Sequence, residues 1–302
     1  MFTPLYCGYE LGTSGNGAQR FRCDDGYRPT FSKTVQGRSV RGVAKVGTEG
    51  GISLGTAMAI SGAAASPNMG YFTTPATAFF MALFDVRLGW WMGNPRYPKK
   101  WQSAGPGLGL GYLLSEVLGQ SDQQKGYVYL SDGGHFENLA VYELIKRRCR
   151  LIVACDVDCD SQYECENLLS LIEKARTDFG VRIEINYEAI RPTDGRQSGA
   201  NHVAGTIYYD PRNPNDTGTL IFIKASLPKK EAAGVKPSDP AERMLPDDVW
   251  HYAKLHAKFP HESTADQWFD ELQFESYRAL GEYIGNHAAS EIGDALSRTV
   301  GY

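Results

Sequence analysis

Asp132 is the residue of this sequence whose type and position best suit chemistry. It follows the short apolar segment 127–130, which predicts a strand, and it precedes two glycines and a stretch with helical periodicity. In open α/β sheets, functional groups gather at the carboxyl ends of strands. A carboxylate there can orient a base or accept a proton from a nucleophile, and Gly133 and Gly134 permit positive φ and close backbone approach. The alternative is an aspartate that only caps a helix in a tight turn.

The segments after Asp132 alternate between helix and strand. Apolar spacing and flanking residues predict a helix, a strand, a helix and a strand, over 136–148, 151–155, 162–179 and 181–185. Gly180 would end the second of these helices. Strand–helix–strand–helix–strand over about sixty residues indicates parallel βαβ units in an α/β sheet.

The rest of the chain carries weaker patterns. Residues 1–50 are rich in Gly, Arg, Ser and Thr without sustained periodicity, which predicts a loop-rich entry segment. A turn-rich stretch between two apolar segments predicts a hairpin of 205–209 with 220–225. Further helices are expected at 53–65, 74–86, 247–258 and 264–284.

Composition excludes several classes of protein. Hydrophobic residues make up 42% and charged residues 22% of the chain, which excludes disordered, collagen-like and low-complexity proteins. The formal net charge is −4, so no nucleic-acid partner is expected. The opening residues lack the basic and apolar regions of a signal peptide. The six cysteines form no recognisable disulfide framework, so reduced thiols and a cytoplasmic location are expected.

Two clusters imitate metal sites without meeting their requirements. The acidic run 156–160 is similar to the start of a calcium-binding loop, but Ser161 stands where glycine is needed and Asn167 where glutamate is needed. Weak cation contact or simple solvation is expected for these carboxylates. Cysteines at 155, 159 and 165 lack a neighbouring histidine and the paired spacing of zinc sites. No metal and no cofactor are therefore predicted.

Four segments resemble one family of enzymes. Segment 131–144 (SDGGHFENLAVYEL) resembles the Asp-Gly-Gly block of patatin-like acyl hydrolases, and 57–71 (AMAISGAAASPNMGY) resembles their upstream block rich in alanine and serine. Segment 2–12 (FTPLYCGYELG) is similar to a segment of the cytosolic phospholipase branch. Segment 259–281 is similar to the C-terminal region of large bacterial patatin-like proteins. The resemblance covers most of the chain.

The resemblance implies a fold, an activity and a site. The fold would be a three-layer α/β/α arrangement with a mainly parallel central sheet, in which residues 1–302 are the C-terminal portion of one patatin-like domain that lacks its N-terminal strands. The activity would be hydrolysis of lipid or phospholipid esters by a Ser-Asp dyad, with Asp132 as its carboxylate. Gly133, Gly134 and Asn138 would support the active-site turn, and no cofactor is needed.

The nucleophile elbow of that family, Gly-x-Ser-x-Gly after a strand, has only imperfect matches here. Segment 51–55 fits the letters, but a glycine-rich loop precedes it, so Ser53 is expected to cap a helix. Segment 12–16 resembles the variant of the phospholipase branch, but no strand leads into Ser14. Ser14 and Ser53 are thus the nucleophile candidates of this chain. The resemblance otherwise implies that an upstream polypeptide supplies the serine and the oxyanion hole.

Two neighbours of the turn bear on these alternatives. His135 follows the turn directly and is expected as a supporting or exposed residue, because the dyad needs no histidine. Aromatic residues gather upstream, at 72, 79, 80, 84, 90 and 91. Core packing is the first interpretation of this aromatic group, and an acyl-chain pocket or a peripheral contact with a membrane is the second. Asp85 and Arg87 interrupt the apolar stretch 75–93, which predicts a core helix rather than a membrane span.

The sequence therefore predicts a lipid acyl hydrolase for which this chain supplies the Asp132 half of a Ser-Asp dyad. One alternative is a split fragment that is inactive until an upstream chain completes it. Another is a non-catalytic member that binds lipid or a partner chain, and a third is an active enzyme with a relocated nucleophile at Ser14 or Ser53. Missing upstream strands would leave an uncovered sheet edge, so self-association is expected.

Overall fold

The computed structural model describes most of the second half of the chain and parts of the first. The described residues are 6–8, 27–29, 54–62, 89–97, 100–101, 106–107, 112, 124–229, 244–263 and 268–300. The chain divides into two compact units, Met1–Asn138 and Leu139–Tyr302, and each is described by itself. Ser14, Ser53, most of the entry segment 1–50 and the helix expected at 74–86 lie outside the described residues. A single domain over the whole length stays a prediction.

A four-stranded sheet forms the centre of the Leu139–Tyr302 unit. Its strands lie in the order β5 (Leu151–Asp156), β10 (Thr217–Lys224), β9 (His202–Tyr208) and β6 (Arg182–Ile185). β5 and β10 pair in parallel, whereas β9 is antiparallel to both of its neighbours. The α/β class is confirmed. The sheet was expected to be mainly parallel, but only the β5–β10 pairing is parallel and the other two pairings are antiparallel. The physical reason is that the β9–β10 hairpin, itself predicted, inserts between β5 and β6.

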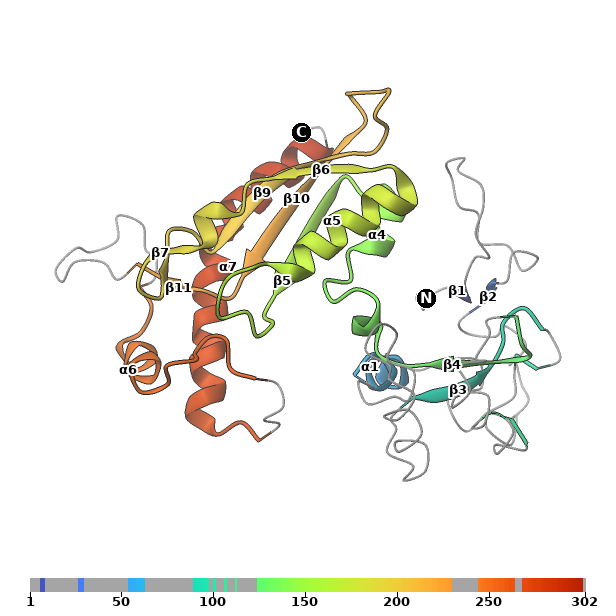
Figure 1. Ribbon diagram of the computed structural model, residues 1–302, viewed down its shortest axis with the longest axis horizontal. Helices are drawn as coiled ribbons and strands as arrows, with labels where there is room; N and C mark the ends of the chain where they lie inside the picture. The colour runs from blue at the N-terminus through green and yellow to red at the C-terminus, as the bar shows by residue number, and fades with distance from the viewer. Residues whose placement is uncertain are drawn as a thin grey trace. The chain divides into compact units, whose positions relative to one another are not determined.

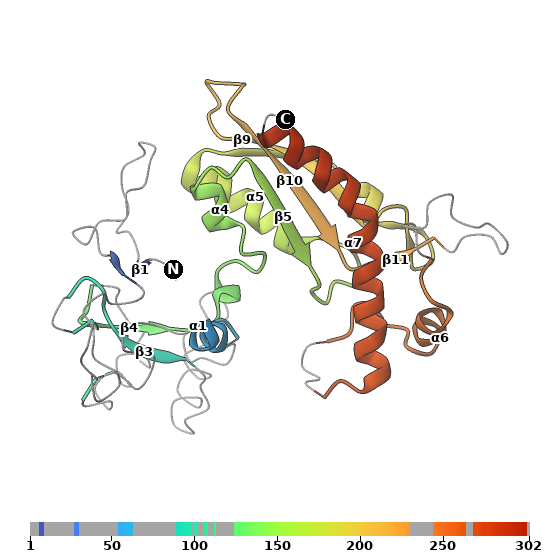
Figure 2. The same ribbon diagram turned by 180° about the vertical axis from the view of Figure 1, so that it is seen from behind.

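Helices cover both faces of this sheet. α5 (Glu166–Phe179) lies on the face seen in Figure 1, with the short α4 (Tyr142–Lys146) packed beside it. α7 (Glu271–Val300) crosses the opposite face and contacts β5 and β10, as the view from behind shows (Figure 2). α7 begins later than the expected helix 264–284 and continues well beyond it. The unit therefore has three layers, helix on sheet on helix.

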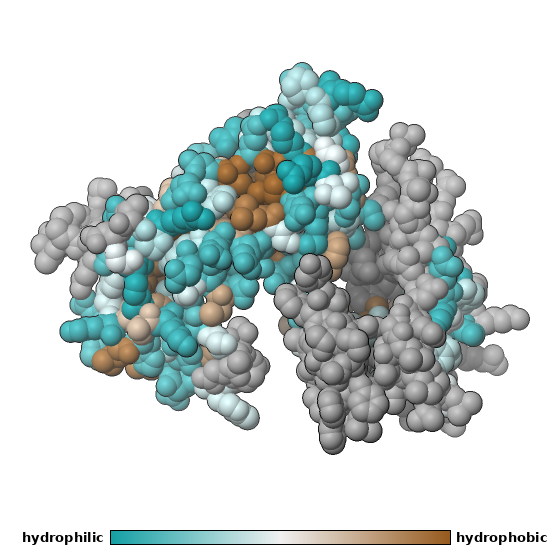
Figure 3. All heavy atoms as spheres, viewed as in Figure 1, coloured by the Kyte–Doolittle hydropathy of each residue, from teal (hydrophilic) through white to brown (hydrophobic). Residues whose placement is uncertain are grey.

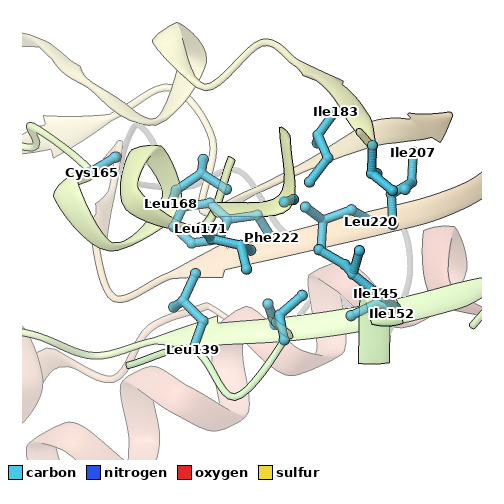
Figure 4. Close-up of a cluster of buried hydrophobic side chains, with 14 of the residues drawn as sticks. Leu139, Ile145, Ile152, Cys165, Leu168, Leu171, Ile183, Ile207, Leu220 and Phe222 are labelled. Atoms are coloured by element: carbon cyan, nitrogen blue, oxygen red, sulfur yellow. The ribbon is translucent and has the colours of Figure 1, made fainter. Parts of the chain in front are cut away.

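The alternation of side chains along β10 explains why both faces are covered. Leu220 and Phe222 are fully buried in the cluster under α5, whereas Ile223 packs against the cluster that includes residues of α7. Successive side chains of a strand point to opposite faces of its sheet, so an almost continuously apolar strand needs a helix on each side. Figure 4 shows Leu168 and Leu171 of α5 next to Phe222.

α5 follows the pattern that its sequence predicts. Leu168, Leu171 and Ala175 are fully buried and lie one turn apart along one face of the helix. Gly180 ends the helix in the left-handed region at φ 67°, and its N–H donates to Arg176 O at 3.1 Å. Glycine carries no Cβ penalty in that conformation, so its position sets the end of the helix.

The single helix expected over 136–148 is wrong. The chain forms a one-turn 3₁₀ helix at Gly133–His135 and resumes as α4 only at Tyr142. Ala140 lies between them at φ 57°, a left-handed conformation that a continuous α-helix excludes. Of the apolar residues in this stretch, Leu139 and Ile145 are buried in the core, whereas Phe136 is 52% exposed.

A second apolar cluster joins α6 (Asp247–Leu255) to α7. Arg196 reaches the end of α6 and donates to the carbonyl oxygens of Ala253 and His256, at 2.8 and 3.2 Å, and of Phe259. The last carbonyls of a helix lack partners within the helix, so the guanidinium satisfies them. A small sheet adjoins this region, with β11 (Leu227–Pro228), β8 (Gln197–Ser198) and β7 (Pro192–Asp194) in that order.

In the Met1–Asn138 unit, β3 (Trp90–Gly93) and β4 (Tyr127–Leu130) form an antiparallel pair. Asn94 extends this pair, because its backbone N–H donates to Gly126 O at 3.0 Å and its side chain to Lys125 O at 2.6 Å. The sequence predicts that β4 belongs to a parallel βαβ unit with β5. The described partner of β4 is instead β3, and the two strands are antiparallel.

Shorter elements complete the described part of this unit. α1 (Leu54–Ser61) confirms part of the helix expected at 53–65. β1 (Tyr6–Gly8) and β2 (Tyr27–Pro29) form an antiparallel pair within the segment 1–50. Trp91 packs edge-on against the ring of Tyr112, with centroids 4.9 Å apart, which agrees with core packing for this aromatic residue.

The surface of the Leu139–Tyr302 unit is largely hydrophilic in the view of Figure 3, with a compact hydrophobic patch over the sheet beside α5 and a smaller one near α6. Among the residues that the structure describes, no helix combines the length and the apolar character needed to cross a bilayer. β5 lies at one edge of the four-stranded sheet, and no second described strand pairs with it.

Leu171→Ala is expected to lower the free energy of unfolding by about 2–5 kcal/mol, because it removes fully buried methyl groups and leaves a cavity. Leu169→Ala is the matched control on the same helix, since Leu169 is 42% exposed. Its cost should stay below about 1 kcal/mol. Urea unfolding monitored by circular dichroism measures both, and equal costs would contradict the assignment of the buried face.

Candidate functional site

Asp132 lies directly after β4, at the carboxyl end of the strand, as the sequence predicts. Its Oδ1 accepts a hydrogen bond from the N–H of Gly134 at 2.9 Å, which caps the 3₁₀ turn Gly133–His135. The capping role given as the alternative is therefore present in the structure. It occupies one carboxylate oxygen, and Oδ2 makes no hydrogen bond to the described part of the chain. Asp132 as a residue is half-buried.

The two glycines of the turn have different roles. Neither adopts the positive φ that glycine permits, since the described glycines in that region are Gly180 and Gly195. The close neighbour of Gly134 is a side chain and not the backbone that was expected, because an added Cβ would lie 2.3 Å from Oδ1 of Asn138. The side chain of Asn138 thus lies against the turn, which places it where the resemblance implies a supporting residue. An added Cβ on Gly133 would meet no atom within 4 Å.

The turn also brings a serine and a histidine together. Ser131 Oγ lies 3.4 Å from Nδ1 of His135, and both side chains are half-buried. In the tautomer that leaves Nδ1 without a proton, the hydroxyl can donate to it and so faces a base. Sequence reasoning placed His135 near the site but did not consider Ser131. The sequence signal that could have found this pair is the spacing of four residues between Ser131 and His135 across the turn.

A second polar cluster lies in the Leu139–Tyr302 unit, at the carboxyl ends of β5 and β10. Lys224 and Asp156 are register partners in this parallel pair, and Lys224 Nζ lies 3.0 Å from Asp156 Oδ2. The two side chains are only 1% and 2% exposed. Burying a charge costs several kcal/mol unless it is paired and hydrogen-bonded, so each of these residues requires the other. Simple solvation had been expected for Asp156 and is wrong.

Asp160 closes the cluster from the loop before α5. Its Oδ2 lies 3.2 Å from Lys224 Nζ, and its two oxygens accept from the N–H groups of Glu164 and Cys165 at 2.8 and 3.0 Å. Burial alone would raise the pKa of Asp160, but these two N–H groups and the ammonium together hold that pKa below its usual value. Asp160 is therefore a carboxylate that positions the start of α5.

His261 packs onto the same loop from the segment between α6 and α7. Its Nδ1 lies 3.3 Å from the backbone nitrogen of Asp160 and 3.3 Å from the carbonyl oxygen of Asp158, so the tautomer sets whether it accepts from the first or donates to the second. The residue is 4% exposed, and burial lowers the pKa of its imidazole, which favours the neutral form. The edge of its ring meets Tyr163, with centroids 4.6 Å apart.

The cysteines near this cluster are free thiols. Cys165 is fully buried, and burial raises its pKa to about 11, so it stays protonated. Cys155 and Cys159 are exposed, and the thiol of Cys159 donates to His261 O at 3.0 Å. Within the described ranges, no group of three or more His, Cys, Asp or Glu side chains is placed to hold a metal ion.

The two clusters differ in what they can do chemically. The Lys224 cluster is closed to solvent and its charges are paired, so it holds elements together. The Asp132 turn is half-exposed and presents a carboxylate oxygen, a hydroxyl and an imidazole within five residues of one another. Only the second arrangement offers groups that a substrate could reach. Of the predicted site residues, Asp132, Gly133, Gly134 and Asn138 lie together in it.

Comparison with known proteins adds no relative. No protein-family model, no curated protein and no solved structure matches the chain. The resemblance to patatin-like acyl hydrolases therefore rests on the sequence motifs, and the function drawn from it is a proposal.

Lys224→Met is expected to lower the free energy of unfolding by about 3–5 kcal/mol, because it leaves the carboxylate of Asp156 buried without its counter-ion. The double variant Lys224→Met with Asp156→Leu removes both charges and should regain a large part of that loss. Lys254→Met, on an exposed position of α6, is the matched control. Urea unfolding measures all three, and an equal loss in the single and double variants would contradict a paired role.

The stability of the protein is expected to fall as the pH drops below about 6.5, where an unfolded chain protonates its histidines. His261 has a lowered pKa in the folded protein, so between its two pKa values the unfolded state binds the extra proton. His261→Gln should therefore flatten the decline between about pH 7.5 and about pH 5.5. His251→Gln, at an exposed position, should leave the slope unchanged. Urea titrations at several pH values provide the measurement; a wild-type slope in His261→Gln would disprove the linkage.

Proposed function

We propose that this protein is a serine acyl hydrolase of lipid esters, and that the turn after β4 carries the catalytic carboxylate, Asp132. The observation that supports this proposal is that the two carboxylate oxygens of Asp132 have different hydrogen bonding. Oδ1 is fixed by the N–H of Gly134, while Oδ2 makes no hydrogen bond to the described residues, and the residue as a whole is half-buried. A carboxylate that is fixed but not saturated suits acid–base chemistry.

The chemistry proposed is acyl transfer through a covalent intermediate. A serine hydroxyl attacks the ester carbonyl carbon, the alcohol leaves, and water releases the acyl group from the serine. The carboxylate of Asp132 favours the step in which the hydroxyl loses its proton. The substrate class, a lipid or phospholipid ester, comes from the resemblance of segment 131–144 and of the upstream block to patatin-like enzymes.

The charge of Asp132 can be removed while the turn keeps its cap, because the cap uses only Oδ1. An asparagine at this position retains an Oδ1 that can accept the hydrogen bond from Gly134 N–H, whereas alanine would lose the cap and about 1 kcal/mol with it. Asp132→Asn therefore changes charge and basicity with little effect on the local backbone.

Asp132→Asn is expected to lower kcat/KM about 10²–10⁴-fold on a short-chain p-nitrophenyl ester and on phosphatidylcholine vesicles, because the variant lacks the negative charge that favours loss of the serine proton. Asp294→Asn, at an exposed position of α7, is the matched control and should keep the activity of the unchanged chain. Circular dichroism and urea unfolding confirm that both variants are folded. Undiminished hydrolysis by a folded Asp132→Asn would rule out the proposed role of the carboxylate.

A further inference from the structure

We infer that Ser131 is the nucleophile of this protein and that His135 is the base that takes its proton. The inference rests on the proposed ester hydrolysis and names two further catalytic residues of the same site. It differs from a Ser-Asp dyad, because the proton passes to an imidazole and not to Asp132. It also places the nucleophile in the described part of the chain, four residues from its base.

The geometry of the turn carries the assignment. β4 ends at Leu130, and the 3₁₀ helix Gly133–His135 then folds the chain back, so that Ser131 Oγ lies 3.4 Å from His135 Nδ1. A distance at the long end of the hydrogen-bond range is usual for a nucleophile and its base before substrate binds, and it shortens in the complex. The backbone fixes the turn, because the N–H groups of Phe136 and Glu137 both donate to Gly133 O at 2.9 Å.

A substrate can reach both groups. Ser131 and His135 are half-buried rather than enclosed, and Gly133 between them is exposed. An added Cβ on Gly133 would meet no atom within 4 Å, so open space borders the turn on that side. A structural serine–histidine contact of the kind found in protein cores would be closed to solvent, as the ring of His261 is.

The chemical step balances within these two residues and water. The Ser131 Oγ–H bond breaks, its proton moves to His135 Nδ1, and Oγ forms a bond to the carbonyl carbon of the ester. The bond from that carbon to the alcohol oxygen then breaks, and the alcohol leaves with the proton from His135. Water next gives a proton to His135 and bonds to the acyl carbon, the bond to Oγ breaks, and Oγ regains the proton.

Asp132 retains a function in this scheme. Its carboxylate is held within the same turn by Gly134 N–H, and its negative charge favours the imidazolium that forms at His135. The negative charge lowers the cost of the proton transfer without itself accepting the proton. Loss of activity in Asp132→Asn is therefore expected both here and in a Ser-Asp dyad, and it is the variants of Ser131 and His135 that distinguish the two.

The experiment uses the full chain, a fluorophosphonate probe and a short-chain p-nitrophenyl ester. Mass spectrometry should find the phosphonate on Ser131. Ser131→Ala should abolish labelling and lower kcat/KM by about 10³-fold or more. His135→Ala should slow labelling about 10²–10⁴-fold, and added free imidazole should restore part of the rate. Rescue by imidazole reports on proton transfer, which a purely structural histidine would not show.

Ser290→Ala is the matched control, because Ser290 is exposed on α7 and lies outside the turn. Its labelling and turnover should equal those of the unchanged chain. Should Ser131→Ala fail to fold, the position of the phosphonate on the unchanged chain decides the question without any variant.

The outcomes separate the inference from the proposed function. A phosphonate on another serine such as Ser14 or Ser53, together with hydrolysis that depends on Asp132, would overturn the assignment of Ser131 and leave the proposed hydrolase standing. Full labelling of Ser131 in His135→Ala would overturn the role of His135. A folded chain with neither labelling nor hydrolysis would overturn both the inference and the activity of this chain as a hydrolase.

Discussion

The ammonium of Lys224, buried between the carboxylates of Asp156 and Asp160, is the interaction on which the Leu139–Tyr302 unit depends. It joins the carboxyl ends of two parallel strands to the loop that starts α5. An unpaired charge in this position would cost several kcal/mol, so the three groups must remain together. The cluster thus aligns β5 with β10 and fixes where the chain leaves the sheet.

The same cluster explains how a distant part of the chain is attached. Asp160 uses its oxygens to order the residues before α5, and its backbone N–H holds the ring of His261. His261 belongs to the segment that leads from α6 to α7, and α7 covers the second face of the sheet. One polar cluster therefore connects the two helical layers, while the apolar side chains of β10 supply the contact area between them.

The turn after β4 shows how one short segment can be both structural and reactive. The sequence presents capping and catalysis as alternatives for Asp132, but a carboxylate has two oxygens and the structure separates them. One oxygen stabilises the backbone of the turn, and the other makes no hydrogen bond to the described residues. The same backbone reversal brings Ser131 to His135. A fixed turn at the end of a strand thus presents several reactive groups without a deep cavity.

The sequence by itself determined the local structure of this protein. Apolar spacing, Gly180 and the turn-rich linker predicted β5, α5, β6 and the β9–β10 hairpin, because these signals act between near neighbours. It also identified Asp132 as the residue after a strand. The sequence did not predict that Ala140 interrupts a helix, because a residue in the left-handed conformation leaves no mark in an apolar pattern.

Only the tertiary structure decided which strands pair and which charges meet. Nothing in the local pattern shows that a hairpin inserts between β5 and β6, because strand order depends on contacts between distant segments. Lys224 in an apolar strand signals a buried partner, but its partner, Asp156, is fixed by the register of two strands. His261 gave no local signal at all. Pairing energies depend on distances in space, and a linear pattern contains only distances along the chain.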